Sequence, residues 1–349
     1  MNAPAMKRTL FPLVLAILCL GPAGCRKHDA SSAAATAARP YLIGIFQSVD
    51  SPTANEVRRG ILQAFADAGL RDGREIVVTI RIANNDIAEV QRIAGELASH
   101  MDMIIPLSTQ ALQAAILTGT RTPIVFGAVA VPYSVGAGRS AESHLANVTG
   151  VVSTGPVRQT LALIREVLPR AHRVGSLWTS SEINSEFYLD QARAAASELG
   201  LELLAASVTG SPEIPRSLQR LFNEKIDVLF PMSDNTLNSS FDVIGRAAAE
   251  NATPLVASFL RSVEFGACAA LGFDFYEMGV RTGRLAVRVK NGENPGQIPI
   301  QSMETVKLYL NEEAARRQNV IFPKAVLDRA DRILRMPAEA GAAPGRLPD

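Results

Sequence analysis

From residue 41 onward, short runs of strand-forming residues alternate with runs in which apolar residues recur every three or four positions. The first strand-type run is YLIGIF at 41–46, and a helical run with Val57, Ile61 and Phe65 on one face follows it. Strands that alternate with amphipathic helices in this way form parallel sheets covered by helices on both faces. We therefore expect an α/β fold. Further strands are expected at 75–83, 102–108, 123–129, 173–178, 202–208, 227–233, 254–259, 267–274 and 306–311.

The alternation pauses once and then restarts. Residues 135–150 (VGAGRSAESHLANVTG) are rich in Gly and Ser and are expected to form a loop. A helix is expected after it at 156–168, and the last long amphipathic helix at 277–292. The repetition before and after the pause predicts two similar lobes, each with its own sheet.

The N-terminus carries the pattern of an export signal that ends at Cys25. A basic start at 6–8 precedes the apolar run LFPLVLAILCL at 10–20, and the small residues at 23–24 form a cleavage site. The apolar run is about half of the roughly 20 residues that a membrane-spanning helix needs. The arrangement resembles the bacterial lipobox, in which the cysteine is lipidated and becomes the new N-terminus, although Pro22 stands where that motif usually has Leu.

The two ends of the chain are expected to lie outside the folded lobes. We expect residues 1–24 to be a signal peptide, Cys25 to carry a lipid anchor, and residues 25–40 to form a flexible tether because they contain little apolar mass. Residues 336–349 are rich in Ala, Gly and Pro and are expected to be a disordered tail. The protein is thus expected to be exported and anchored to a membrane of the cell envelope, on its periplasmic or extracellular face.

Charge and motif content exclude several classes of function. The formal net charge is +1 and no basic stripe is present, so nucleic acid is not expected as a partner. The histidines at positions 28, 100, 144 and 172 lack the spacing of a zinc motif, and neither a nucleophile elbow nor a Walker A loop occurs. We expect no catalytic residue, no metal and no cofactor. An extracellular hydrolase is the weakest of the functions considered.

Polar and mostly uncharged residues follow the strand-type runs in both halves. In open parallel sheets, ligands bind at the carboxyl ends of strands, where helix N-termini present free N–H groups. Such residues can bind a small ligand between two lobes, with Phe126, Phe259 or Phe275 for apolar contact. The alternative is that each of them only caps a helix. The strand ends are Gln47-Ser48, Ser108-Thr109-Gln110, Phe126-Gly127-Ala128, Thr179-Ser180-Ser181 with Asn184-Ser185, Ser233-Asp234-Asn235-Thr236, Ser258-Phe259 and Asp274-Phe275.

Several sequence blocks occur in a fixed order over roughly residues 41–330. They are GIFQSVD, IPLSTQALQAA, PIVFGAV, NVTGV, RVGSLWTSSEINS, PMSDNT and GACAALGFDFYEMGVRTGRLA. Together they resemble the ABC transporter substrate-binding lipoproteins related to the tryptophan-binding protein. The chain departs from that family's pattern after FGAV, where Ala130-Val131-Pro132 replaces a common Thr-Asp-Pro and lacks its carboxylate.

The resemblance implies the type I fold of periplasmic binding proteins. That fold has two lobes, each a parallel sheet flanked by helices, with three hinge crossovers and a cleft that closes on its ligand. The implied N-terminal lobe comprises residues 41–150 plus 272–298, and the C-terminal lobe comprises residues 151–271 plus 299–335.

The resemblance also implies a binding pocket and roles for some of its residues. For an amino-acid ligand, Asp234 and Asp274 are the candidates for the ammonium group, and Ser108 and Thr109 for the carboxylate. The implied pocket residues are Gln47, Ser108, Thr109, Phe126, Gly127, Ala128, Asn184, Asp234, Asn235 and Asp274.

Two functions follow from these expectations. The leading one is a lipid-anchored receptor that captures a small solute, for instance an aromatic amino acid, and delivers it to the transmembrane subunits of an ABC permease. The alternative is a module that senses a ligand and reports to a membrane signalling partner. Both use the same cleft, so the sequence leaves both open.

Overall fold

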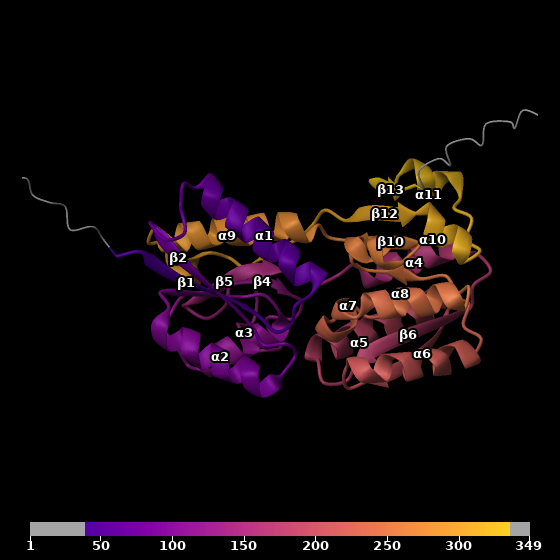
Figure 1. The fold of residues 1–349 in the computed structure, drawn as a ribbon, viewed down its shortest axis with the longest axis horizontal. Helices are drawn as coiled ribbons and strands as arrows, with labels where there is room; N and C mark the ends of the chain where they lie inside the picture. Colours follow the sequence, from indigo (N-terminus) through magenta and orange to yellow (C-terminus); the bar gives the residue numbers. More distant parts are fainter. Residues whose placement is uncertain (1–38, 336–349) are drawn as a thin grey trace, which may run out of the picture. The chain divides into compact units, whose positions relative to one another are not determined.

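The computed structural model describes residues 39–335, which contain two lobes (Figure 1). The predicted signal peptide at 1–24, the lipidation site at Cys25, most of the predicted tether and the predicted tail at 336–349 lie outside the described residues. Among residues 39–335, no helix combines the length and the apolar character needed to cross a membrane.

The first lobe is built on a six-stranded, all-parallel sheet in the order β11-β5-β4-β3-β1-β2. Successive side chains of a strand point to opposite faces, so Ile45 packs into the core on one side and Phe46 into the core on the other. Both faces are therefore apolar. The strands are β1 (Tyr41–Gln47), β2 (Ile76–Ile82), β3 (Met103–Pro106), β4 (Ile124–Val129), β5 (Val148–Val152) and β11 (Gln301–Ser302).

Two helices from distant parts of the chain, α1 (Pro52–Asp67) and α9 (Phe275–Lys290), lie side by side against one face of this sheet (Figure 1). Glycines allow their backbones to touch, since a Cβ on Gly60 would lie 2.2 Å from the carbonyl oxygen of Tyr276. Helix α9 therefore belongs to the first lobe, although it follows most of the second lobe in sequence.

The opposite face of the sheet is covered by α2 (Ile87–His100) and α3 (Thr109–Leu117). Each begins at a polar residue whose side chain accepts a main-chain N–H of the first turn, Asp86 for α2 and Ser108 for α3. The N-terminus of α3 thus follows directly after β3, at the carboxyl edge of the sheet.

The second lobe contains two smaller sheets, ordered β7-β6-β8 and β13-β12-β10-β9. A parallel bridge between Leu229 and Leu255 joins them, and β12 runs antiparallel to β10. The strands are β6 (Arg173–Thr179), β7 (Glu202–Val208), β8 (Val228–Leu229), β9 (Val256–Ala257), β10 (Ala269–Gly272), β12 (Lys307–Asn311) and β13 (Arg332–Leu334).

The helices of the second lobe bury one apolar face each in a core shared with these sheets. Helix α6 shows this clearly, because Ile214, Leu218 and Leu221 are buried while its other face is exposed. The α-helices are α4 (Val157–Val167), α5 (Ile183–Glu198), α6 (Ile214–Asn223), α7 (Asn235–Ser239), α8 (Phe241–Glu250), α10 (Glu312–Arg317) and α11 (Lys324–Asp328). The 3-10 helices are η1 (Ser211–Glu213), η2 (Leu260–Phe265) and, after α9, η3 (Pro295–Gln297).

The chain passes between the lobes three times, after β5, after β10 and after β11. The predicted α/β fold with two lobes and three crossovers is confirmed. The predicted lobe boundaries at 150/151 and 298/299 fall within β5 and just before β11, and both strands pair in the six-stranded sheet of the first lobe. Assignment of the exact residues to each lobe stays a prediction.

Two segments differ from the sequence-based expectation. The predicted loop at 135–150 ends in β5, whose pairing with β4 begins at Val148. The predicted strand at 227–233 forms a ladder only at Val228 and Leu229, and continues as extended chain towards α7. Both strands depend on partners far along the chain, which local periodicity does not reveal.

Candidate functional site

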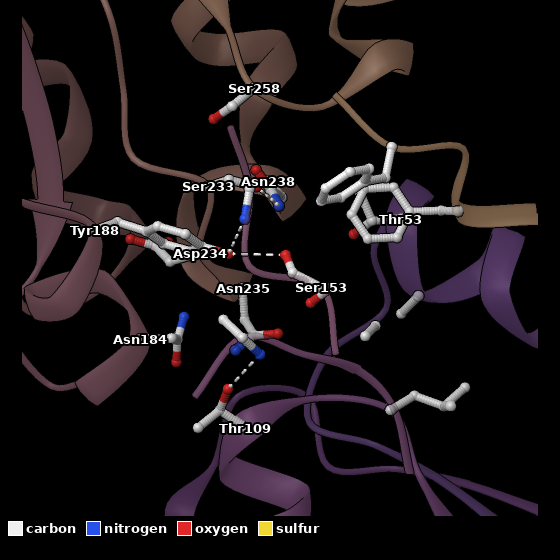
Figure 2. Close-up of a pocket in the computed structure, with 17 residues that line it drawn as sticks. Thr53, Thr109, Ser153, Asn184, Tyr188, Ser233, Asp234, Asn235, Asn238 and Ser258 are labelled. Carbon is white, nitrogen blue, oxygen red and sulfur yellow. Dashed lines mark hydrogen bonds between the residues drawn. The ribbon is translucent and has the colours of Figure 1, made fainter. Parts of the chain in front are cut away.

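A cavity lies at the carboxyl ends of strands from both lobes. Its polar side chains converge on a common space, as Figure 2 shows. Ligands of open α/β sheets bind at this position, and none of the lining residues is Lys, Arg or His. The cavity is lined by Thr53, Ala54, Leu107, Thr109, Ala128, Ala130, Ser153, Gly155, Asn184, Tyr188, Ser233, Asp234, Asn235, Asn238, Ser258, Phe273 and Phe275.

The wall contributed by the second lobe is organised by Asp234, the N-cap of α7. Its Oδ1 accepts the main-chain N–H of Leu237 at 2.7 Å. Its Oδ2 accepts the hydroxyl of Ser185 at 2.7 Å and the main-chain N–H of Thr179 at 3.2 Å. Both carboxylate oxygens are therefore engaged within the protein, in the capping role that the sequence left open as an alternative.

A second buried carboxylate, that of Glu182, also sits at the N-terminus of α7. It is 1% exposed and accepts the main-chain N–H groups of Asn235 and Thr236 at 3.0 and 2.9 Å. It also accepts the side-chain amide of Asn235 at 2.6 Å and the hydroxyl of Thr236 at 2.8 Å. Amides at a helix N-terminus stabilise an anion, so the protein itself supplies the anion that neutralises this end of α7.

Burial and the neighbouring Glu182 change the ionisation of Asp234. Burial raises the pKa of Asp234 to about 8, the negative charge of Glu182 acts in the same direction, and the hydrogen bonds from Leu237, Ser185 and Thr179 oppose the rise. Two carboxylates that share one buried site do not both ionise easily. Asp234 therefore loses its proton at a higher pH than an ordinary aspartate does.

Two side-chain amides on the same wall have free acceptor oxygens. Asn184 donates through Nδ2 to Glu182 Oε2 at 3.3 Å, and Asn238 donates through Nδ2 to Ser233 Oγ at 3.1 Å. In the described part of the chain, the Oδ1 atoms of Asn184 and Asn238 are buried and have no hydrogen-bond partner. A buried acceptor without a partner is costly, so both oxygens are suited to receive hydrogen bonds from a ligand.

The wall contributed by the first lobe presents the N-termini of α1 and α3. Ser51 and Ser108 cap these helices, and Thr53 and Thr109 of the first turns line the cavity. Within residues 39–335, the main-chain N–H groups of Thr53 and Thr109 donate to no protein acceptor. Open N–H groups at the ends of these helices favour an anionic ligand group.

One tyrosine of α5 and two phenylalanines at the second crossover complete the cavity. The hydroxyl of Tyr188 accepts the N–H of Gly155 at 3.1 Å and donates to the carbonyl of Ser153 at 3.0 Å, so it ties α5 to the first crossover. Burial raises the pKa of Tyr188 to about 12, which keeps the hydroxyl protonated. Phe273 and Phe275 flank the second crossover and add apolar surface.

The structure brings half of the predicted pocket residues together around the cavity. Thr109 and Ala128 line it from the first lobe, and Asn184, Asp234 and Asn235 line it from the second. Ala128 has a left-handed backbone with φ of 54° next to a register shift in β4, and irregularities of this kind are common beside functional sites.

The other predicted residues lie near the cavity but do not line it. The Gln47 side chain donates to Asn55 Oδ1 and to the Val49 carbonyl at the end of β1, and it accepts from Arg58. Ser108 serves as the cap of α3.

Phe126, Gly127 and Asp274 are likewise placed outside the lining. Phe126 lies fully buried in the core beneath α2 and α3. Gly127 allows close approach of α9, since a Cβ there would lie 2.8 Å from the Thr282 hydroxyl. Asp274 caps α9 and pairs with Lys307 at 2.8 Å. Burial alone would raise the pKa of Asp274, but Lys307 and the main-chain N–H of Glu277 outweigh it and lower that pKa.

Sequence reasoning missed several residues of the site. Tyr188 and Asn238 stand four positions after Asn184 and Asp234, which places them one helical turn further on the same face. That spacing was a usable signal. Glu182 and Thr53 carried no signal beyond their position near the start of a helix.

Comparison with known proteins places the chain among binding proteins. Residues 42–334 match the family described as ABC transporter substrate binding protein. A tyrosine-binding protein of Clostridioides difficile (strain R20291) is 31% identical over 299 residues, which is 84% of this chain and 86% of that protein.

Two solved structures cover almost the same part of the chain. The ABC domain in complex with L-Trp from Streptococcus pneumonia has a TM-score of 0.81 at 25% identity, covering 85% of this chain and 100% of its own. The ligand-free, open structure of CD0873, a substrate-binding protein with adhesive properties from Clostridium difficile, has a TM-score of 0.64 at 30% identity, covering 84% of this chain and 99% of its own. The described arrangement of the lobes is thus more similar to the complex than to the open structure, despite the lower identity.

Proposed function

This chain belongs to the ABC transporter substrate-binding protein family and has the type I periplasmic binding protein fold, and from that premise we propose that it captures a free aromatic amino acid in the cavity between its lobes. The family consists of solute-binding proteins and not of enzymes. Delivery of the ligand to the transmembrane subunits of an ABC permease is part of the same proposal.

The observation that carries the proposal is the pair of free amide oxygens on Asn184 and Asn238. They offer two acceptors to an α-ammonium group from the second lobe. The free N–H groups of Thr53 and Thr109 on the first lobe offer donors to an α-carboxylate. A zwitterion forms hydrogen bonds with the acceptors of one wall and the donors of the other. A purely anionic or purely cationic solute forms them with one wall only.

The rest of the lining supports a large apolar side chain. Tyr188, Phe273 and Phe275 contribute aromatic surface, and aromatic rings pack favourably against one another. The relatives described as tyrosine-binding and as a complex with L-Trp support the same class of ligand.

This proposal assigns the roles differently from the sequence-based hypothesis. Asp234 is occupied as the cap of α7, and Asp274 does not line the cavity, so the ammonium is assigned to the two asparagines. Thr109 keeps its proposed role at the carboxylate. Ala128 and Asn235 are proposed to contact the ligand as wall residues.

Binding is tested by thermal shift and isothermal titration with L-Trp, L-Tyr, L-Phe, L-Leu and glucose. Ligand that binds only the folded protein raises the melting temperature, so the aromatic amino acids are expected to give the largest shift. Indole-3-propionate, which lacks the ammonium, and tryptamine, which lacks the carboxylate, are expected to bind more weakly than L-Trp. Absence of any shift, together with absence of a co-purified small molecule by mass spectrometry, contradicts the proposal.

Export and anchoring are proposed from the sequence pattern at Cys25. Acyl chains supply membrane affinity, so Cys25→Ser is expected to move the protein from the membrane fraction to the soluble fraction. Equal membrane retention of the variant contradicts a lipid anchor. Uptake of the labelled amino acid by cells that lack the gene, with and without a restored copy, tests delivery to a permease.

A further inference from the structure

A hydrogen bond joins the rim of the first lobe to the buried wall of the second. The Nδ2 of Asn85, an exposed residue between β2 and α2, donates to Oγ1 of Thr236 at 3.1 Å. Thr236 is 1% exposed, and its hydroxyl donates in turn to Glu182 at 2.8 Å. The contact therefore links two lobes through a residue that is itself held by a buried carboxylate.

The loop that carries Asn85 is held in one unusual conformation. Asn84 and Asn85 both have left-handed backbones, with φ of 52° and 64°. The N–H of Asn85 donates to the carbonyl of Ser48 at 2.7 Å, and the N–H of Ala83 donates to the carbonyl of Gln47 at 3.0 Å. Residues other than Gly adopt this region at some cost, and Asn does so most readily. These bonds fix the backbone that presents the Asn85 amide.

We propose that Asn85 is a latch residue that favours the closed arrangement of the lobes and slows ligand release. Its partner Thr236 lies in α7, the helix that places Asn235 and Asn238 in the cavity wall. Opening of the cleft separates Asn85 from Thr236, since they belong to different lobes. The latch thus positions the helix that contacts the ligand without touching the ligand itself.

The effect on ligand release rests on the proposed function, whereas the effect on lobe closure does not. Apparent affinity falls with the fraction of molecules in the competent state. Loss of one hydrogen bond of ordinary strength is expected to raise the dissociation rate roughly 2- to 10-fold. The association rate is expected to change little, because the latch forms after the ligand has entered.

The chain offers a matched pair of variants for this test. Asn85→Gly removes the amide and keeps a residue that accepts positive φ. Asn84→Gly makes the same change at the neighbouring residue, whose side chain makes no hydrogen bond among the described residues. Dissociation of labelled L-Tyr and L-Trp is measured for both by chase with unlabelled ligand. Faster release from Asn85→Gly alone is expected.

Small-angle X-ray scattering without ligand tests closure by itself. Asn85→Gly and Thr236→Val are expected to increase the radius of gyration relative to Asn84→Gly, while Thr236→Ser, which keeps the hydroxyl, is expected to match the wild type. Identical scattering of Asn85→Gly and Asn84→Gly overturns the latch whether or not the ligand is known. If scattering differs but neither amino acid binds, the latch stands and the proposed ligand class fails.

Discussion

The two walls of the cavity are both made of strand ends and helix N-termini, but they use those N-termini in opposite ways. In the first lobe, α1 and α3 leave the N–H groups of Thr53 and Thr109 without a protein acceptor among residues 39–335. In the second lobe, Glu182 and Asp234 fill the N-terminus of α7 with the protein's own carboxylates. The same βα unit thus yields a donor wall on one side and an acceptor wall on the other. The difference shows that a helix N-terminus remains open to an anionic ligand only where no internal anion occupies it.

The largest expected effect comes from removing the internal anion. Glu182→Ala leaves two main-chain N–H groups and two side-chain donors of Asn235 and Thr236 without their acceptor. Hydrogen bonds to charged groups are the strong ones, so the free energy of unfolding is expected to fall by roughly 3 kcal/mol. Urea denaturation measures the loss. Ser108→Ala in the other wall is the control, because it removes a neutral cap and a neutral hydrogen bond with Ser48 and costs about 1 to 2 kcal/mol. Equal losses in the two variants contradict the contrast between the walls.

The next effect concerns the side-chain oxygens of Asn184 and Asn238, which accept no hydrogen bond within residues 39–335. Asn238→Leu in α7 removes a free acceptor oxygen and keeps the approximate volume of the side chain. Asn184→Leu makes the same change in α5. Each is expected to weaken binding of L-Trp by about 2 kcal/mol, the value of a hydrogen bond to a charged group. Titration with L-Trp and with indole-3-propionate, which lacks the ammonium, separates the two walls. A similar loss for both ligands would assign these oxygens to something other than the ammonium.

A third effect follows from the proton on Asp234. Its pKa in the folded protein is about 8, above the ordinary value of 3.8, so between these values the folded protein binds more protons than the unfolded chain. Raising the pH within this window therefore lowers the free energy of unfolding, by at most about 1.4 kcal/mol per pH unit for one proton. Urea denaturation at pH 6 and at pH 7 is expected to show this decline in the wild type. In Asp234→Asn the free energy of unfolding is expected to depend less on pH. An unchanged slope would mean that another group causes the decline.

The smallest effect is expected at Asp274. Its carboxylate caps α9 and pairs with Lys307, and both side chains are partly exposed. Asp274→Asn keeps the cap, and loss of a partly exposed ion pair costs less than about 1 kcal/mol of stability. Affinity for L-Trp is expected to remain that of the wild type in titration. A large loss of affinity with an intact fold would return the ammonium role to this carboxylate.

Much of the fold was predictable from local pattern. The strand expected at 41–46 is β1 (Tyr41–Gln47), and the helix expected at 156–168 is α4 (Val157–Val167). These elements can be predicted from the sequence because their apolar residues recur with the period of a strand or a helix. Elements defined by distant pairing, such as β5 and the short β8, were missed or misjudged in length.

The candidate site was predictable only in part. Strand ends identified Thr109, Ala128, Asn184, Asp234 and Asn235, because parallel sheets expose their carboxyl ends to ligands. The same rule also selected Gln47, Phe126 and Asp274, which lie near strand ends but direct their side chains into the core or towards neighbouring protein groups.

The sequence by itself therefore determined most of the order of strands and helices, the two-lobed α/β class and the edge of the sheets at which a ligand is expected. The tertiary structure alone decided which polar groups at that edge are free. Glu182 reaches across 53 positions to the N–H of Asn235, and Asp234 is reached by Thr179 from 55 positions away. A donor or acceptor is available to a ligand only when no such distant residue already hydrogen-bonds to it. Local periodicity does not predict these distant partners, because they are brought together only by the tertiary fold.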